Sequence, residues 1–160
     1  MSTQNIREVT VTSYYEVYLG RQVEIKQLLS EVVALLQRLP LGRDDVGLSA
    51  AVSEVNHVYP FVRLVYLLDE RGLQISNNIT VERDGQIRVD RVRGQDRSQR
   101  PYFDETVSGV IITEPYISLA DGEVCVSVSF QVPQSIDAMS RVVIDCNLTE
   151  VLSYLSSDMF

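Results

Sequence analysis

The residues that most often carry out chemistry in proteins are scarce in this chain of 160 residues, which has one histidine and two cysteines. His57 stands where a helical segment meets an apolar strand, a position typical of a surface or helix-end histidine. Cys125 and Cys146 lie on segments that should form neighbouring strands, so they either face each other or are two reduced core thiols. Three such ligands are too few for a zinc site, and no nucleophile elbow, paired-histidine zinc motif or phosphate-binding loop is present. We therefore expect a protein that is not an enzyme and that holds no metal or cofactor.

The side chains best suited to bind a ligand are arginines. The stretch 81–100 holds six of them, interleaved with aspartates: Arg83, Arg88, Arg91, Arg93, Arg97 and Arg100. A guanidinium group presents a planar fork of donors that matches a carboxylate, and such charge-assisted hydrogen bonds contribute roughly 1.5–3 kcal/mol each. The interleaved acids leave a second interpretation open, a solvated loop in which Arg100 pairs with Asp96 or Asp104.

The overall charge disfavours several classes of partner. With 14 basic and 22 acidic side chains the net charge is −8, which disfavours binding to nucleic acid or to an anionic membrane surface. No apolar run reaches the roughly 18 residues that a membrane-spanning helix needs. The N-terminus also lacks the apolar core of a secretory signal. We therefore expect a cytoplasmic protein with neither nucleic acid nor membrane among its partners.

Residues 1–41 are expected to form a long amphipathic helix, because apolar residues recur there at steps of three, four and seven. One series at steps of seven runs through Tyr18, Ile25, Val32 and Leu39. A helix of some 30 residues is about 45 Å long, which is more than one domain of this size covers. We therefore expect part of its apolar face to pair with a second copy of the chain, giving a homodimer.

The remainder, residues 48–160, is typical of a sheet with short helices around it. A short helix is expected over 49–57, with Ser49 as a candidate N-cap, and a closing helix over 148–155. Five strands are expected at 61–68, 73–79, 110–113 continuing into 116–119, 124–132 and 141–146. Hairpin links between these strands predict an antiparallel sheet with helices packed on it, a single α+β domain.

Two further features point to a cavity on this sheet. The connection 81–100 is expected to be mainly loop, with a short helix beginning near 96 or 98 and running to 106. It is too long for a hairpin, so it must cross the sheet and cover a pocket. In the strand 124–130, apolar residues alternate with Cys125, Ser127 and Ser129, which predicts one face on a core and one face toward a polar cavity or water.

Four segments together resemble a known family. Residues 94–103, Gly-Gln-Asp-Arg-Ser-Gln-Arg-Pro-Tyr-Phe, resemble the pocket motif of Cache-type sensor domains, also called PDC domains, which are related to the PAS fold. Residues 69–78 are similar to the first hairpin of that family, residues 114–118 to its Pro-Tyr segment, and residues 142–148 to its last strand. The four segments span about residues 61–155. The resemblance implies a ligand-binding sensor with a PAS-like, five-stranded antiparallel sheet backed by the long N-terminal helix.

The resemblance also implies a set of ligand-binding residues. In the amino-acid-binding branch, the motif arginine binds the ligand carboxylate, and the aromatic residue two positions later lines the pocket. The tyrosine of Pro-Tyr contributes a hydroxyl, and the aspartate of the last strand meets the ligand amine. Carried over to this sequence, these positions are Arg100, Tyr102, Tyr116 and Asp145. Plain core packing of Tyr102, and N-capping of the last helix by Asp145, are the structural alternatives.

Departures from the family pattern widen the range of ligands. Gln95 stands where the amino-acid branch has an aromatic residue, and Tyr102 stands where tryptophan is common. Another small carboxylate is therefore as good a candidate as an amino acid. Family members are usually tied to a membrane and a transmitter domain. Because this sequence shows neither a membrane segment nor a transmitter domain, we expect a free-standing sensor that signals to an unknown protein partner through its long helix. The alternative is a non-catalytic interaction protein with a degenerate pocket, assembling through that helix.

Overall fold

The computed structural model describes residues 13–42, 44–119, 122–132 and 141–158. One antiparallel sheet has the strand order β3-β2-β1-β7-β6-β4, and β5 also pairs with β6. Its strands are β1 (Val62–Leu68), β2 (Asn78–Val81), β3 (Ile87–Asp90), β4 (Ile111–Ile112), β5 (Tyr116–Ile117), β6 (Val124–Gln131) and β7 (Arg141–Asn147). A helical stretch at residues 13–20 is followed by α2 (Gln22–Gln37), α3 (Asp45–Val58) and α4 (Leu148–Asp158). The α+β class with a PAS-like antiparallel sheet is confirmed.

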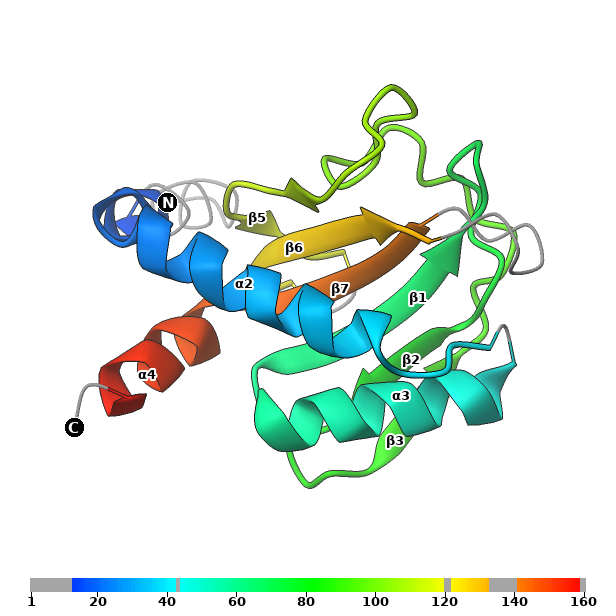
Figure 1. Cartoon of the computed structure of the whole chain (residues 1–160), viewed down its shortest axis with the longest axis horizontal. Helices are drawn as coiled ribbons and strands as arrows, with labels where there is room; N and C mark the ends of the chain where they lie inside the picture. Colours follow the sequence, from blue (N-terminus) through cyan, green and yellow to red (C-terminus); the bar gives the residue numbers. More distant parts are fainter. Residues whose placement is uncertain (1–12, 43, 120–121, 133–140, 159–160) are drawn as a thin grey trace, which may run out of the picture.

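The main core lies between the sheet and the two helices α2 and α3, which lie together on one face of the sheet (Figure 1). On β6 the side chains of Val126, Val128 and Phe130 point to this face and are at most 2% exposed. Burying a side chain of this size stabilises the fold by roughly 1.5–3 kcal/mol. The alternation in the sequence of β6 therefore predicted the core face correctly.

The N-terminal helix is interrupted at Arg21, so it is not the single straight helix that the periodicity predicted. Arg21 has φ −128° and ψ 21°, and its N–H donates to the carbonyl of Tyr18 at 3.1 Å. Gly20 precedes the break and has a poor helix propensity. Tyr18, Ile25 and Val32 are at most 1% exposed and pack on the chain's own core. The series that motivated the homodimer is thus used within the domain, and the dimer itself stays a prediction.

The stretch expected to be mainly loop contains an edge strand, β3. It pairs with β2 through Ile79↔Val89 and Thr80↔Arg88, and Gly85 turns the hairpin with φ 87°. Four residues of alternating type are too short a signal to stand out among so many charges. The sheet therefore extends one strand beyond the five predicted.

Two neighbouring boundaries also differ from the prediction. β2 begins at Asn78 and not at residue 73, because the hydroxyl of Ser76 accepts the N–H of Leu67 at 2.8 Å where a strand partner would otherwise do so. The expected strand over 110–119 is divided into β4 and β5.

Aspartates account for the remaining differences among the helices. α3 begins earlier than predicted, because Asp44 and not Ser49 is its N-cap, accepting the N–H of Gly47 at 2.8 Å. The short helix expected between 96 and 106 is absent from that fully described segment. Asp96 and Asp104 each accept the backbone N–H two residues later and hold turns in its place.

The two cysteines lie on opposite faces of the sheet. Cys125 pairs across the ladder with Asn147, and Cys146 pairs with Val126, so the two side chains are out of register by one residue. Both are buried and free, and burial raises the pKa of the Cys146 thiol. The interpretation as two reduced thiols holds.

Residues 91–110 cross the face of the sheet opposite the helices, from β3 at one edge to β4 at the other, as the long connection predicted. Under this crossing loop lies a second buried cluster: Leu64, Tyr66, Leu68, Tyr102 and Val143. The turn after β1 touches the loop at Gly72, which has φ +84°. A Cβ on Gly72 would lie 2.9 Å from the Cα of Ser98 and 3.1 Å from Cε1 of Phe103, so only glycine fits.

A buried arginine that the sequence did not single out anchors this loop. Arg141 of β7 is 2% exposed, and its Nη2 donates to the carbonyls of Val107 at 2.9 Å and Gly109 at 2.7 Å. Its Nη1 donates to Ser129 Oγ at 3.1 Å, and that hydroxyl donates to the carbonyl of Tyr102 at 2.6 Å. The crossing loop is thus fixed at three points by one buried polar network.

We predict that Arg141→Met lowers the free energy of unfolding by about 1–3 kcal/mol, because the polar groups that Arg141 satisfies lose their partner. Arg91→Met, a change of the same type at an exposed position of the same loop, should alter it by less than about 0.5 kcal/mol. Urea denaturation of both variants measures the difference. An Arg141→Met protein as stable as the parent would show that the loop does not depend on this anchor.

Candidate functional site

All four sequence-predicted ligand-binding residues line one cavity of about 600 Å³. It lies between the crossing loop and the sheet. Arg100 and Tyr102 come from the loop, Tyr116 comes from β5 and Asp145 comes from β7. We call this space the arginine cavity, because Arg88 and Arg97 also line it. That these residues bind a ligand remains a prediction.

Arg100 is half-buried and lies against an aromatic ring. Its Cζ atom is 5.5 Å from the ring centroid of Tyr116, a cation–π contact worth roughly 0.5–1 kcal/mol where water still reaches it. The structural alternative, an ion pair with Asp96 or Asp104, is not formed, and Arg100 has no ion pair within the described part of the chain. Its donor fork is therefore suited to an anion inside the cavity.

Asp145 stands at the end of a short hydrogen-bonded chain. Ser127 Oγ donates to Asp145 Oδ1 at 2.5 Å, and Tyr116 Oη lies 2.6 Å from Ser127 Oγ. Because Ser127 uses its proton on the carboxylate, the tyrosine is the donor to Ser127. The alternative role of Asp145 as the cap of α4 is taken by Asn147, whose Oδ1 accepts the N–H of Glu150 at 3.1 Å. The polar face predicted for β6 thus contributes to the site through Ser127.

Tyr102 has a packing role as well as a place in the cavity wall. It is 3% exposed and contacts Tyr66 edge-on, with ring centroids 5.8 Å apart. The core interpretation is therefore correct for most of its ring. Gln95, the residue that departs from the family pattern, also lines the cavity and makes that part of the wall polar.

Tyr66 and Arg97 are among the cavity residues that sequence reasoning did not assign to the site. Tyr66 lies in a strand of continuous apolar residues, where nothing distinguishes a cavity position from a core position. Arg97 lies inside the family-like motif but carries no assigned role there. It donates from Nε to the buried Gln74 at 3.0 Å, which ties the loop to the turn before β2.

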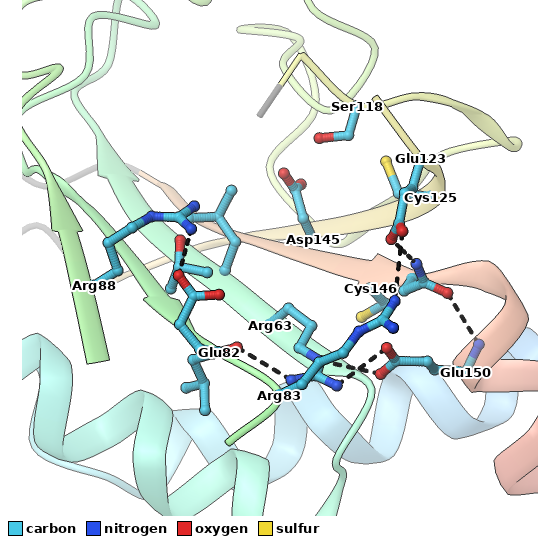
Figure 2. Close-up of a pocket in the computed structure, with 14 residues that line it drawn as sticks. Arg63, Glu82, Arg83, Arg88, Ser118, Glu123, Cys125, Asp145, Cys146 and Glu150 are labelled. Carbon is cyan, nitrogen blue, oxygen red and sulfur yellow. Dashed lines mark hydrogen bonds and ion pairs between the residues drawn. The ribbon is translucent and has the colours of Figure 1, made fainter. Parts of the chain in front are cut away.

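A second cavity of about 330 Å³ adjoins the first, and Figure 2 shows its lining. We call it the distal cavity. Asp145 lies in the middle of this view, with Arg88 reaching in from β3 on one side and Glu123 on the other. Arg63 binds Glu150 in the first turn of α4 through two hydrogen bonds, of 3.0 and 3.1 Å. The distal cavity therefore extends from Asp145 to Glu150 at the start of α4.

Other candidate chemistry is not assembled. His57 is exposed in the last turn of α3, as expected. Within the residues that the structure describes, no group of three or more His, Cys, Asp or Glu side chains is placed to bind a metal. None of the helices in the described ranges is both long enough and apolar enough to cross a membrane.

Comparison with known proteins identifies the class of fold. No protein-family model matches the chain, and no curated protein matches it. The ligand-binding domain of the Campylobacter jejuni chemoreceptor Tlp3, in complex with L-norvaline, aligns over 92% of this chain and 62% of that one, with a TM-score of 0.61 and 12% identity. The Bacillus subtilis YkuI protein, which has an EAL domain and was crystallised with c-di-GMP and calcium, aligns over 93% of this chain and 35% of that one, with a TM-score of 0.58 and 21% identity. A domain assigned to the sensory box/GGDEF family from Vibrio parahaemolyticus aligns over 96% and 63%, with a TM-score of 0.54 and 14% identity.

These structures share a fold with this chain, and the fold is one used by ligand-binding sensor domains of chemoreceptors and by sensory box domains. The resemblance to Cache-type sensors found in the sequence is confirmed at the level of the fold. The chain spans 35% of the YkuI chain and 62% of the Tlp3 chain, so what those whole proteins do is a separate question.

The buried tyrosines of the site predict a loss of stability at alkaline pH. Burial, and after it the Asp145 carboxylate, raise the pKa of Tyr116 far above its ordinary value of 10.0. Above about pH 10 the unfolded chain loses this proton and the folded chain keeps it, so the free energy of unfolding falls as the pH rises further. Below that pH the contribution of Tyr116 to the free energy of unfolding does not change with pH.

Tyr116→Phe should therefore reduce the steepness of this fall by up to about 1.4 kcal/mol per pH unit. Denaturation curves from about pH 9 to about pH 11 for the parent and the variant test the effect. Equal slopes would show that Tyr116 ionises in the folded protein as it does in the unfolded chain.

Proposed function

We propose that this chain is a ligand-binding sensor module that takes up a small carboxylate-containing molecule and signals its presence to a protein partner. The proposal rests on the surroundings of the Arg100 side chain. Its guanidinium lies in a cavity of about 600 Å³, held against Tyr116 and without an ion pair in the described part of the chain. A partly buried cation is costly without an anionic partner, and a ligand carboxylate supplies one.

The opposite wall of the cavity supports an amino-acid-like ligand as one member of this class. Asp145 provides a carboxylate that suits an ammonium group, and Tyr116 and Tyr102 provide aromatic surface that limits access of water. The Tlp3 domain, which shares the fold, was solved with the amino acid L-norvaline. Gln95 makes part of the wall polar where the amino-acid-binding branch has an aromatic residue, so simple carboxylates remain candidate ligands as well.

A route for the signal runs from the cavity to the N-terminal helical stretch. Tyr15 in that stretch donates a hydrogen bond to Glu114 at 3.3 Å, two residues before Tyr116. The hydroxyl of Tyr14 lies 2.9 Å from that of Thr149 in α4. A ligand that moves Tyr116 can act on the N-terminal helical stretch through Glu114, and on α4 through the contact between Tyr14 and Thr149. This supports the N-terminal helix as the element that presents the signal to a partner.

The competing function is a non-catalytic interaction protein whose pocket is degenerate. The two functions differ in their response to ligands. A ligand at 100 times its dissociation constant stabilises the folded state by about 2.7 kcal/mol, which is visible as a rise in melting temperature. A screen of amino acids and short carboxylic acids that produces no rise favours the interaction protein.

We predict that Arg100→Ala weakens carboxylate binding by at least about 100-fold, because two charge-assisted hydrogen bonds are lost. Arg100→Lys should also bind poorly, since a single ammonium group does not reproduce the planar fork. The free energy of unfolding of Arg100→Ala should differ from that of the parent by no more than about 1 kcal/mol, the value of an accessible cation–π contact. Calorimetric titration with acetate and with the best amino acid of the screen gives the affinities.

The matched control is Arg93→Ala, which removes the same charge from an exposed position of the same loop. It should bind as the parent does. If Arg100→Ala is clearly less stable than the parent and still binds, Arg100 is a structural residue and the proposed function is wrong.

We also propose a homodimer, on the basis of the apolar side chains that the N-terminal helical residues leave exposed. Of the N-terminal helical residues, Val17 and Leu19 are about half exposed and Val23 is 80% exposed. We expect sedimentation equilibrium at tens of micromolar to give about twice the chain mass of 18.1 kDa. Val23→Glu should give a monomer, whereas Val46→Glu, at an equally exposed valine of α3, should leave the dimer intact. A monomeric parent protein ends this proposal.

A further inference from the structure

The arginine cavity and the distal cavity adjoin each other. They share four lining residues, Leu64, Arg88, Ser118 and Asp145, so each wall of their junction belongs to both. Their volumes are about 600 and 330 Å³. A ligand bound at Arg100 by its carboxylate therefore has room to extend past Asp145 into the distal cavity.

The two parts carry opposite formal charge. Three guanidinium groups and two carboxylates line the arginine cavity, which gives it an excess of one positive charge. Four carboxylates and three guanidinium groups line the distal cavity, which gives it an excess of one negative charge. The electrostatic potential along the combined space thus favours a molecule that is anionic at one end and cationic at the other.

Arg88 lies at the junction and is held there by exposed ion pairs. Its Nε donates to Asp90 at 3.1 Å and its Nη1 donates to Glu82. The side chain of Arg88 is 45% exposed, and those of Glu82 and Asp90 are 39% and 41% exposed. Ion pairs this exposed contribute little to stability, so Arg88 is free to move when a ligand competes for Glu82.

A polar atom without a partner lies beside Arg88. Thr80 is the cross-strand partner of Arg88 and lines the distal cavity, and its buried hydroxyl has no hydrogen-bond partner within the described residues. A buried hydroxyl in this state is unfavourable. A ligand with a donor group at its distal end could satisfy this hydroxyl, because Thr80 lines the distal cavity.

The wall between the two charged ends includes an apolar residue, Leu64, beside the polar Arg88, Ser118 and Asp145. Leu64 lines both parts, and Val81 and Cys125 line the distal cavity next to it. These apolar side chains suit a chain of methylene groups, which gains by leaving water. Leu64 therefore offers an apolar contact to the middle of an elongated molecule within a junction that is otherwise polar.

From these observations we propose that the site recognises an elongated amino carboxylate, and that Arg88 determines the ligand length it accepts. The carboxylate binds at Arg100, the methylene chain passes Leu64, and the terminal ammonium group lies in the distal cavity between Glu82 and Asp145. This deepens the proposed function and rests on it, because the carboxylate end is the ligand of the arginine cavity.

The test compares four probes by calorimetric titration: acetate, caproate, adipate and ε-aminocaproate. All four carry a carboxylate, the last three have chains of the same length, and only ε-aminocaproate has an ammonium group at the far end. We expect ε-aminocaproate to bind about tenfold more tightly than caproate or adipate, the gain from one charge-assisted hydrogen bond.

The variant Arg88→Ala tests the second half of the proposal. It removes a cation next to the ligand ammonium group and opens the junction, so the affinity for ε-aminocaproate should rise further, by about fivefold or more, while the affinity for acetate should fall by about two- to threefold, because Arg88 also contributes positive charge to the arginine cavity. Arg88→Gln should give the same order of affinities if the alanine variant folds poorly. Arg93→Ala, which removes the same charge from outside both cavities, is the control and should bind as the parent does.

The outcomes separate this inference from the function on which it rests. If acetate and the longer acids bind in an Arg100-dependent way but ε-aminocaproate has no advantage, the elongated ligand class is wrong and the carboxylate sensor stands. If the advantage is present but Arg88→Ala leaves it unchanged, Arg88 does not set the length. If none of the four probes binds, the carboxylate sensor fails and this inference fails with it.

Discussion

The structure depends on the chemical difference between the two faces of β6 and β7. One face is apolar and is covered by α2 and α3, while the other carries Ser127, Ser129, Arg141 and Asp145. Polar groups removed from water are costly unless they find hydrogen-bond partners. Carbonyl groups of the crossing loop accept hydrogen bonds from Ser129 and Arg141. The loop thereby covers the space in which Ser127 and Asp145 meet. Core and cavity are therefore two consequences of one period-two pattern.

Two arginines on this side of the sheet differ in how their guanidinium groups are accommodated. Arg141 is enclosed, and three main-chain or hydroxyl oxygens accept its hydrogen bonds. Arg100 lies at the rim, and its contact in the described residues is the face of an aromatic ring, which leaves the donor fork available. Burial together with the supply of oxygen acceptors thus decides whether each guanidinium group is saturated by the protein.

Much of this was predictable from the sequence, and the failures have physical causes. The two faces of β6, the crossing connection and the four grouped residues of the arginine cavity followed from alternation and from a motif that resembles Cache-type sensors. β3 was missed because four alternating residues carry little signal, and the break at Arg21 was missed because one glycine is tolerated in many helices. Arg141 was missed for a different reason: a lone arginine at the start of an apolar strand does not indicate which carbonyls the fold will bring to it. The distal cavity is lined by residues of five strands and of α4, an arrangement that no local pattern encodes.

The close approach at Gly72 has a consequence for how such a sequence can change over time. The hairpin turn and the pocket loop are separate segments, yet a side chain at position 72 would collide with Ser98 and Phe103. Any lineage that replaced this glycine would first have to move the loop, and moving the loop would displace the Arg100 side chain. Selection that keeps Arg100 in the cavity would therefore also act on this turn. In diverging copies of the gene, the two segments should be kept or lost together.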